Sequence, residues 1–248
     1  MKKSHIASTL LVCLLVVGAF VYAHRKQKAF LVGNEFKQIS LSLQNFISAN
    51  TNLPPAVAWG DQDPPSPLYS WRLIIAPYLH GGGYPPADLQ SPWDSEGNLC
   101  FHKMRTSLSF SLGPSDNPGY LARIYAVTGA DTAFGAADEK ATDWYPEKLP
   151  TDTIIAIEVG HSDKHWMEPV DYEINTIGEI IVLENGHLLA GASPDRFHVI
   201  FADFEVWALS TETPFVNLKN FLSITGASVH DRDELLAPYC LGICYDGG

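Results

Sequence analysis

The stretch IASTLLVCLLVVGAFVYA, residues 6–23, contains no charged residue, follows Lys2 and Lys3, and precedes the basic segment HRKQK, residues 24–28. As a helix it is about 27 Å long at about 1.5 Å per residue, close to the roughly 30 Å of a bilayer's hydrocarbon core. Residues 1–23 are therefore predicted to form a signal anchor. The apolar side chains expected to contact lipid are Ile6, Leu10, Leu11, Leu14, Leu15 and Phe20.

A cleavable signal peptide fits the same residues, because two lysines precede the apolar run and Ala23 closes a cleavage pattern. Both hypotheses export residues 24–248, which we expect to fold as a single extracytoplasmic domain. The domain is either held at the inner membrane by one span or released to the periplasm or cell surface. The orientation of the anchor is ambiguous by charge. The positive-inside rule places basic residues in the cytoplasm, whereas export would place Arg25, Lys26 and Lys28 on the outer side.

A second helical pattern follows the basic segment. Apolar residues recur at helical spacing while polar residues fill the other face, which predicts an amphipathic helix. The apolar positions are Phe36, Ile39, Leu43, Phe46 and Ile47. Asn50, Asn52 and Pro54-Pro55 are expected to end the helix, because proline removes backbone donors. One continuous helix from Ile6 to Ala49 would be about 66 Å long at about 1.5 Å per residue, with one half in lipid and the other against a domain.

The composition is that of an acidic globular protein. The chain has 248 residues, 46% of them hydrophobic, which supports a sizeable core. Its 16 basic and 28 acidic residues give a formal net charge of -12, which opposes the charge of a phosphate backbone. Nucleic acid is therefore excluded as a partner.

The second half of the chain predicts strands. Segments rich in Ile, Val, Tyr and Thr and bounded by Gly, Pro or Asp are typical of β-strands. They are Tyr120–Val127, Thr153–Val159, Ile177–Leu183 with His187–Ala190 around the Asn185-Gly186 turn, and Phe197–Ala202 with Glu205–Leu209. Short helices are expected within Tyr69–Leu79 and over Val216–Leu222. Helix first and antiparallel strands later indicate an α+β fold.

Several blocks of sequence occur in an order that resembles a known family. They include Phe36-Lys37-Gln38-Ile39, Leu53-Pro54-Pro55, Ser70-Trp71-Arg72-Leu73, Pro92-Trp93-Asp94-Ser95, Tyr125-Ala126-Val127-Thr128-Gly129, Trp166-Met167-Glu168-Pro169 and Phe201-Ala202-Asp203. On these blocks the chain resembles bacterial pilin-like proteins that are expanded in planctomycetes and catalogued as domain of unknown function 1559. The resemblance implies a pilin-like α+β fold, with a long prepilin-type N-terminal helix in the inner membrane. The rest of that helix packs on an antiparallel β-sheet with long loops.

The resemblance also carries an expectation about function. No catalytic activity is established for that family, so it implies a non-enzymatic cell-envelope protein without a cofactor. Such a protein acts through protein–protein assembly with other envelope or pilin-like proteins. The alternatives are an exported soluble binding module for a glycan or peptide, released after signal cleavage, and an exported metal-dependent hydrolase. For a hydrolase, the sequence offers no Gly-x-Ser-x-Gly nucleophile motif.

The chain departs from the family's pattern in two places. The family's leader usually ends in glycine and carries a glutamate early in the apolar segment, whereas no acidic residue precedes Glu35 here. Filament registration by that carboxylate is therefore not expected. The family's late turn commonly contains Ala-Asp-Gly, where this chain has Ala202-Asp203-Phe204. We expect a changed turn, because phenylalanine is strained at positive φ and glycine is not.

Two groups of residues are candidate metal ligands. His161 and His165 are four residues apart, beside two glutamates, and would point the same way on a helix, as a zinc site requires. The competing interpretation is a loop after a strand. Asp231 and Asp233 offer the hard oxygen ligands that calcium takes. The competing interpretation is the solvated acidic start of a helix.

Three cysteines lie beyond the apolar run: Cys100, Cys240 and Cys244. In an oxidising compartment, a disulfide between Cys240 and Cys244, or from Cys100 to one of them, would leave one free thiol. Three unpaired thiols are the alternative.

Overall fold

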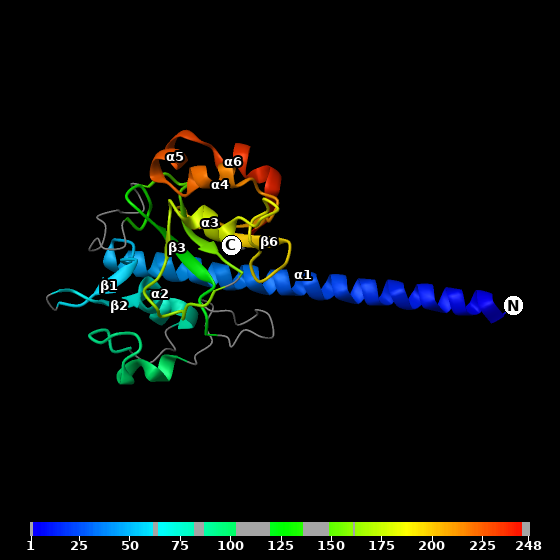
Figure 1. Ribbon diagram of the computed structural model, residues 1–248, viewed down its shortest axis with the longest axis horizontal. Coiled ribbons are helices and arrows are strands. Elements are labelled where there is room, and N and C mark those ends of the chain that lie inside the picture. The colour runs from blue at the N-terminus through cyan, green and yellow to red at the C-terminus, as the bar shows by residue number, and fades with distance from the viewer. Residues whose placement is uncertain are drawn as a thin grey trace.

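The computed structural model describes residues 2–61, 64–81, 87–102, 120–135, 149–160 and 162–244, with side chains described except at residues 2–11, 80, 81 and 244. One long N-terminal helix lies against a main sheet, and short helices surround the two (Figure 1). The predicted α+β fold, with a long N-terminal helix packed on a largely antiparallel sheet, is confirmed.

Helix α1, Lys2–Asn50, is continuous, as predicted. Its C-terminal half lies across the domain and its N-terminal half extends away from it (Figure 1). The half that contacts the domain completely buries Val32, Phe36, Ile39 and Leu43. These residues are spaced three or four apart, so they form one face of the helix, and the predicted amphipathic pattern is confirmed.

Helix α1 ends where the turn chemistry predicts. Thr51 adopts a left-handed conformation with φ 71°, and its N–H donates to the carbonyl of Ile47 at 2.6 Å. This contact closes the last turn in the manner of a left-handed C-cap. The chain then turns into the domain, where Leu53 is buried before Pro54 and Pro55.

The N-terminal half of α1 carries exposed apolar side chains. Leu14, Leu15 and Phe20 are exposed, Phe20 by 73%. The side chains of the other predicted anchor residues, Ile6, Leu10 and Leu11, lie outside the described part. Over the residues that the structure describes, no helix combines the length and the apolar character needed to cross a membrane.

The main sheet, over the described residues, has six strands in the order β5-β3-β4-β6-β7-β8. Their bounds are β3 Ile124–Thr128, β4 Ile154–Glu158, β5 Tyr172–Glu173, β6 Arg196–Phe201, β7 Val206–Ser210 and β8 Cys240–Cys244. Neighbouring strands pair antiparallel, except that β5 runs parallel to β3. The predicted hairpin of β6 and β7 is present, with His198 opposite Ala208.

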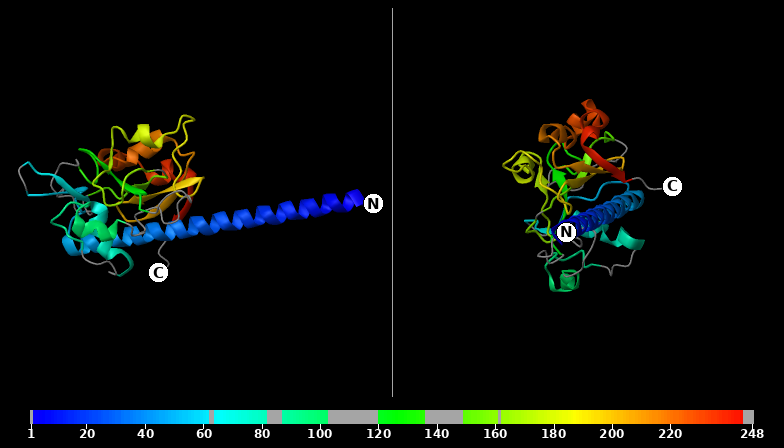
Figure 2. Two further views of the ribbon diagram at one scale, coloured as in Figure 1. Left: turned by 60° about the horizontal axis from the view of Figure 1, so that its bottom comes forward. Right: turned by 90° about the vertical axis from the view of Figure 1, so that its right-hand side faces the viewer.

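Helices cover both faces of the main sheet. Helix α1 contacts β6, β7 and β8. The C-terminal helices α4 (Phe215–Phe221), α5 (Ile224–Val229) and α6 (Arg232–Leu235) lie on the opposite side of the sheet (Figures 1 and 2). Every residue of β3 and β4 is buried as a result. Strands covered on both faces are continuous apolar runs, which is the pattern of these two segments.

Short elements complete the domain. In chain order they are β1 Val57–Trp59, β2 Pro67–Ser70, α2 Trp71–Ile75, the 3₁₀ helices η1 Ala76–Gly81 and η2 Glu96–Phe101, then α3 Ile177–Ile181, α4 Phe215–Phe221, α5 Ile224–Val229, α6 Arg232–Leu235 and η4 Ala237–Tyr239. Strands β1 and β2 pair antiparallel beside α2. The helices predicted within Tyr69–Leu79 and over Val216–Leu222 correspond to α2 with η1 and to α4.

Two predicted strands, those of the hairpin Ile177–Leu183 with His187–Ala190, are wrong. The segment Ile177–Leu183 forms helix α3, because Ile177 and Ile181 are four residues apart and both enter the core. Gly178 lies between them against the ring of Phe215, where a Cβ would come within 2.7 Å of a ring carbon. Tertiary packing therefore overrides the β-propensity of the isoleucines. Of the expected hairpin with His187–Ala190, one bridge between Val182 and Leu188 remains.

Candidate functional site

A groove of about 830 Å³ runs between the middle of α1 and the β6–β8 side of the main sheet. Helix α1 contributes nine residues between Tyr22 and Lys37, which form one wall. The opposite wall comes from β6, β7, β8 and the turn before β6, and includes Ser193 and Ile243.

The groove is basic although the protein is acidic. Five basic side chains line it: Arg25, Lys26, Lys28, Lys37 and Arg196. Among the described residues that line it, Asp195 is the one acid, and Arg196 donates to both of its carboxylate oxygens, at 3.0 and 2.7 Å. These hydrogen bonds hold the pKa of Asp195 below its ordinary value, and the charge of Arg25 contributes. An anionic ligand would therefore enter a groove with excess positive charge.

Ser193 lines the same groove and carries a buried hydroxyl group. The residue is 4% exposed, and its Oγ makes no hydrogen bond with any part of the chain that the structure describes. A buried hydroxyl without a partner costs free energy, and most such groups in native proteins are satisfied. A ligand that accepts a hydrogen bond from Ser193 would recover that cost.

His198 lines the groove and belongs to a buried polar cluster that joins α1 to the sheet. Its ring stacks on Phe36 with 5.0 Å between centroids, and its Nδ1 donates to Glu158 at 2.6 Å. Arg123, which is fully buried, donates to Glu158 at 3.0 Å and pairs with Glu35 of α1. These contacts connect α1 with β4, β6 and the residue before β3.

Glu158 is the centre of this cluster. Its carboxylate also accepts from the backbone N–H groups of Ala192 and His198, at 2.8 and 3.1 Å. Burial would raise the pKa of Glu158, but His198 and Arg123 outweigh it and lower the pKa to about 2. Gly191 leaves room for the carboxylate, since a Cβ there would lie 2.3 Å from Cδ of Glu158. Because Nδ1 of His198 is committed to Glu158, only its Nε2 remains for a ligand.

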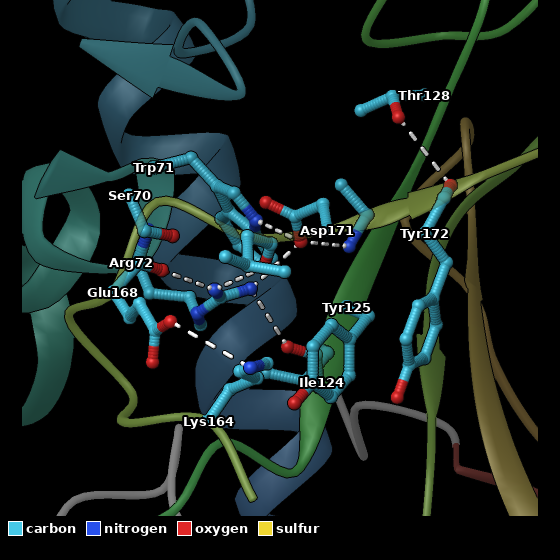
Figure 3. Close-up of polar contacts among 12 residues, drawn as sticks. Ser70, Trp71, Arg72, Ile124, Tyr125, Thr128, Lys164, Glu168, Asp171 and Tyr172 are labelled. Atoms are coloured by element: carbon cyan, nitrogen blue, oxygen red, sulfur yellow. Dashed lines mark hydrogen bonds and ion pairs between the residues drawn. The ribbon is translucent and has the colours of Figure 1, made fainter. Parts of the chain in front are cut away.

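A second buried cluster surrounds Arg72 at the start of α2 (Figure 3). The guanidinium donates to Asp171 Oδ1 and to the carbonyls of Ile124, Trp166, Glu168 and Val170, at 2.7 to 3.2 Å. Asp171 Oδ1 also accepts from Trp71 Nε1 and from the backbone N–H of Ala126. Arg72 thereby fastens α2 to β3 and to the loop before β5. The Ser-Trp-Arg-Leu and Trp-Met-Glu-Pro blocks of the sequence meet here, and their role is structural.

His165, a predicted zinc ligand, has both ring nitrogens occupied. Its Nδ1 accepts from the backbone N–H of Met167 at 3.2 Å, and its Nε2 donates to the carbonyl of His102 at 3.0 Å. Burial lowers the pKa of His165, which favours the neutral ring. The ring also stacks on Trp93 and Tyr120. The prediction is therefore wrong for His165, which is a structural histidine, and His161 lies outside the described residues.

Asp231 and Asp233, the predicted calcium ligands, lie at the start of helix α6. Asp231 is the N-cap, and its Oδ1 accepts from the backbone N–H of Asp233 at 2.7 Å. The competing interpretation, an acidic helix start, is confirmed. Across the described ranges, no three His, Cys, Asp or Glu residues are arranged to hold a metal ion.

The predicted disulfide between Cys240 and Cys244 is wrong, because Cys240 is a free thiol. Both cysteines belong to strand β8, and residues four apart in a strand are about 13 Å apart, too far for a bridge. Cys100 is also free and is exposed, so the alternative bridge from Cys100 to Cys240 is absent. Burial raises the pKa of the Cys240 thiol and keeps it protonated.

The fold and these clusters define an α+β protein with a half-exposed N-terminal helix and a basic groove beside that helix. The chain belongs to the family described as "Protein of unknown function (DUF1559)", whose profile matches residues 33–159. The matched residues include Glu35, Arg123 and Glu158 of the first buried cluster and Arg72 of the second. No curated protein and no solved structure matches the chain significantly.

Proposed function

We propose that this chain is a non-enzymatic, pilin-like protein of the cell envelope, held at the inner membrane by its N-terminal helix and acting through protein–protein assembly. The observation that carries the proposal is the division of α1 into two halves. One half is part of the domain core, and the other exposes apolar side chains to solvent. An exposed helix of this kind requires a lipid or protein environment.

The exposed half is apolar on every side. Leu14, Leu15, Val16 and Val17 are consecutive and each is more than half exposed. Successive residues of a helix are about 100° apart, so four in a row surround the axis. A helix that is hydrophobic all round is buried in lipid or among other helices. Residues 12–23 are about 18 Å long at about 1.5 Å per residue, so a full span would use residues 6–11 as well.

The domain half of α1 is attached firmly enough to position the exposed half. Glu35 pairs with the buried Arg123, and Ser40 donates to the carbonyl of Phe204 in the β6–β7 turn at 2.7 Å. Polar links and the apolar face together hold the helix in one register on the sheet. A rigid helix with a fixed domain at one end is suited to ordered packing with neighbouring copies or related proteins.

Fractionation of the native cell tests the membrane attachment. We expect the protein in the inner-membrane fraction, resistant to alkaline carbonate. The Leu15→Lys variant should shift to the soluble fraction, because a lysine within the apolar half is costly in lipid. Ser48→Lys places the same charge at an exposed position in the domain half of the same helix and should leave the protein in the membrane. A wild-type protein found wholly in the cytoplasm would refute the proposal.

Cysteine cross-linking tests the assembly. Cys13 is free and exposed on the projecting half, so a single cysteine can be moved from Val12 to Leu15 after the other cysteines are replaced by serine. If neighbouring helices pack side by side, at least one of the four positions should give a cross-linked dimer in membranes. A variant without any cysteine is the control. Monomer at all four positions would contradict assembly through this helix.

An exported binding module is the second candidate, and the groove favours it. A cut after Ala23 would leave all the basic residues of the groove in the mature chain. The intact mass of the protein purified from its own cells separates the two functions. A mature chain that starts at His24 supports the binding module and excludes the retained anchor.

A further inference from the structure

We propose that the groove between α1 and strands β6–β8 binds the phosphate group of an anionic phospholipid at the membrane surface, an inference that rests on the membrane attachment proposed above. Arg25, Lys26 and Lys28 supply positive charge, whereas Arg196 is paired with Asp195. Ser193 supplies a buried hydroxyl that has no partner among the described residues. A phosphate is negatively charged and accepts several hydrogen bonds, so it matches this combination of groups.

The position of the groove favours a lipid over a soluble anion. Arg25 follows the last residue of the apolar run, Ala23, by about 3 Å along the helix axis, which is the level of the lipid headgroups if the run spans the bilayer. Lys26 lies over the ring of Tyr22 at 5.1 Å, and tyrosine is enriched at membrane interfaces.

Binding of an anionic lipid would also explain why basic residues directly follow the apolar run, where they oppose export. Positive charges directly beyond an anchor disfavour transfer of that end across the membrane. Anionic headgroups attract such residues, so headgroup binding would favour their placement beside the anchor. An acidic segment of a partner protein would meet the same charges, but it would leave the nearness of the apolar run without a role.

The test uses the full chain in a neutral maltoside detergent and measures lipid binding by native mass spectrometry. Phosphatidylglycerol should bind at least tenfold more tightly than phosphatidylcholine with the same acyl chains. Ser193→Ala combined with Arg25→Gln and Lys28→Gln should weaken phosphatidylglycerol binding at least tenfold. The control, Lys164→Gln with Lys219→Gln, removes two positive charges outside the groove and should bind as the parent does. Removing an unpaired hydroxyl does not destabilise a fold, so thermal unfolding of Ser193→Ala should match the parent.

Three results would overturn the inference. The first is equal binding of the two lipids, or equal weakening in the groove and control variants. The second is inorganic phosphate or glycerol phosphate binding as tightly as the lipid, which would assign the groove to a soluble phosphate compound. The third is displacement of phosphatidylglycerol by a short polyglutamate peptide at lower concentration, which would assign it to an acidic partner. Lipid binding in detergent is separate from cell fractionation, so failure of this inference is distinguishable from failure of the proposed function.

Discussion

Glu158 of β4 accepts a 2.6 Å hydrogen bond from Nδ1 of His198 of β6, directly beneath the face of α1 that carries Phe36. Arg123 extends this pair to Glu35 on α1 itself. The attachment of the long helix to the sheet therefore includes a buried carboxylate that must be ionised to bind its neighbours.

Acid should weaken the fold in a defined pH window. The pKa of Glu158 is lowered from 4.5 to about 2 in the fold, so the folded state favours the carboxylate. Its contribution to stability is complete above about pH 4.5 and is lost as the pH falls from there to about 2. We expect the free energy of unfolding to decrease by up to about 3 kcal/mol over this window, measured by urea denaturation followed by circular dichroism. The Glu158→Gln variant should be less stable at neutral pH and should show a flatter profile. An identical acid profile in that variant would contradict the assignment.

Replacing Gly191 by alanine should destabilise the protein through the same carboxylate. The new Cβ would lie 2.3 Å from Cδ of Glu158, and a buried ion pair leaves little freedom to move. Forced overpacking costs about 1 to 3 kcal/mol, and we expect a loss in this range by thermal or urea denaturation. Gly242→Ala is the matched control, because a Cβ at Gly242 meets nothing within 4 Å. Equal stability of the two variants would contradict the close fit at Gly191.

Local patterns explain why the long helix and the β6–β7 hairpin can be predicted. The apolar run and the spacing of Phe36, Ile39 and Leu43 each specify a helix over more than ten residues. Helix α3 could not be predicted in this way, because five residues rich in isoleucine fit either element. The packing of Gly178 against Phe215 decides it, and that contact joins residues far apart in the chain.

The buried cluster and the groove depend on tertiary structure to the same degree. Glu35, Arg123, Glu158 and His198 belong to different elements, and no spacing rule links them. One local signal is available: Glu35 lies on the buried stripe of α1 between Val32 and Ile39, where a charge needs a partner. The groove has a weaker signal, the occurrence of four basic residues that line it within thirteen residues of α1, from Arg25 to Lys37.

Replacing Arg72 by lysine should be strongly destabilising even though the charge is kept. Arg72 is fully buried and donates to four carbonyls and to Asp171. Lysine has three donors and cannot reproduce the planar fork. Breaking a buried pair costs about 3 to 5 kcal/mol, so we expect a loss of this size in the free energy of unfolding. The control is Arg196→Lys, whose pairing with the exposed Asp195 should be worth less than about 1 kcal/mol. Similar losses in both variants would refute the structural role of Arg72.

At position 204, a glycine variant should be more stable than an alanine variant, which is the reverse of the usual order. The turn between β6 and β7 places Phe204 at φ 68°. Phe204 therefore adopts the left-handed conformation that glycine favours, although the family's glycine is absent here. The backbone is held there by the N–H of Phe204 donating to the carbonyl of Phe201 at 2.9 Å and by Ser40 donating to the carbonyl of Phe204 at 2.7 Å. Neither contact involves the side chain of Phe204, so both persist in the alanine and glycine variants.

Alanine at 204 would lose the packing of the ring and keep the strain of a left-handed residue, about 1 to 2 kcal/mol. Glycine would lose the same packing and relieve the strain. Phe204→Gly should therefore be more stable than Phe204→Ala by about 1 kcal/mol in urea denaturation. Lys219, exposed within helix α4, is the control, because alanine there should be more stable than glycine by about 1 kcal/mol. If alanine is the more stable residue at both positions, the turn does not hold residue 204 in the left-handed conformation.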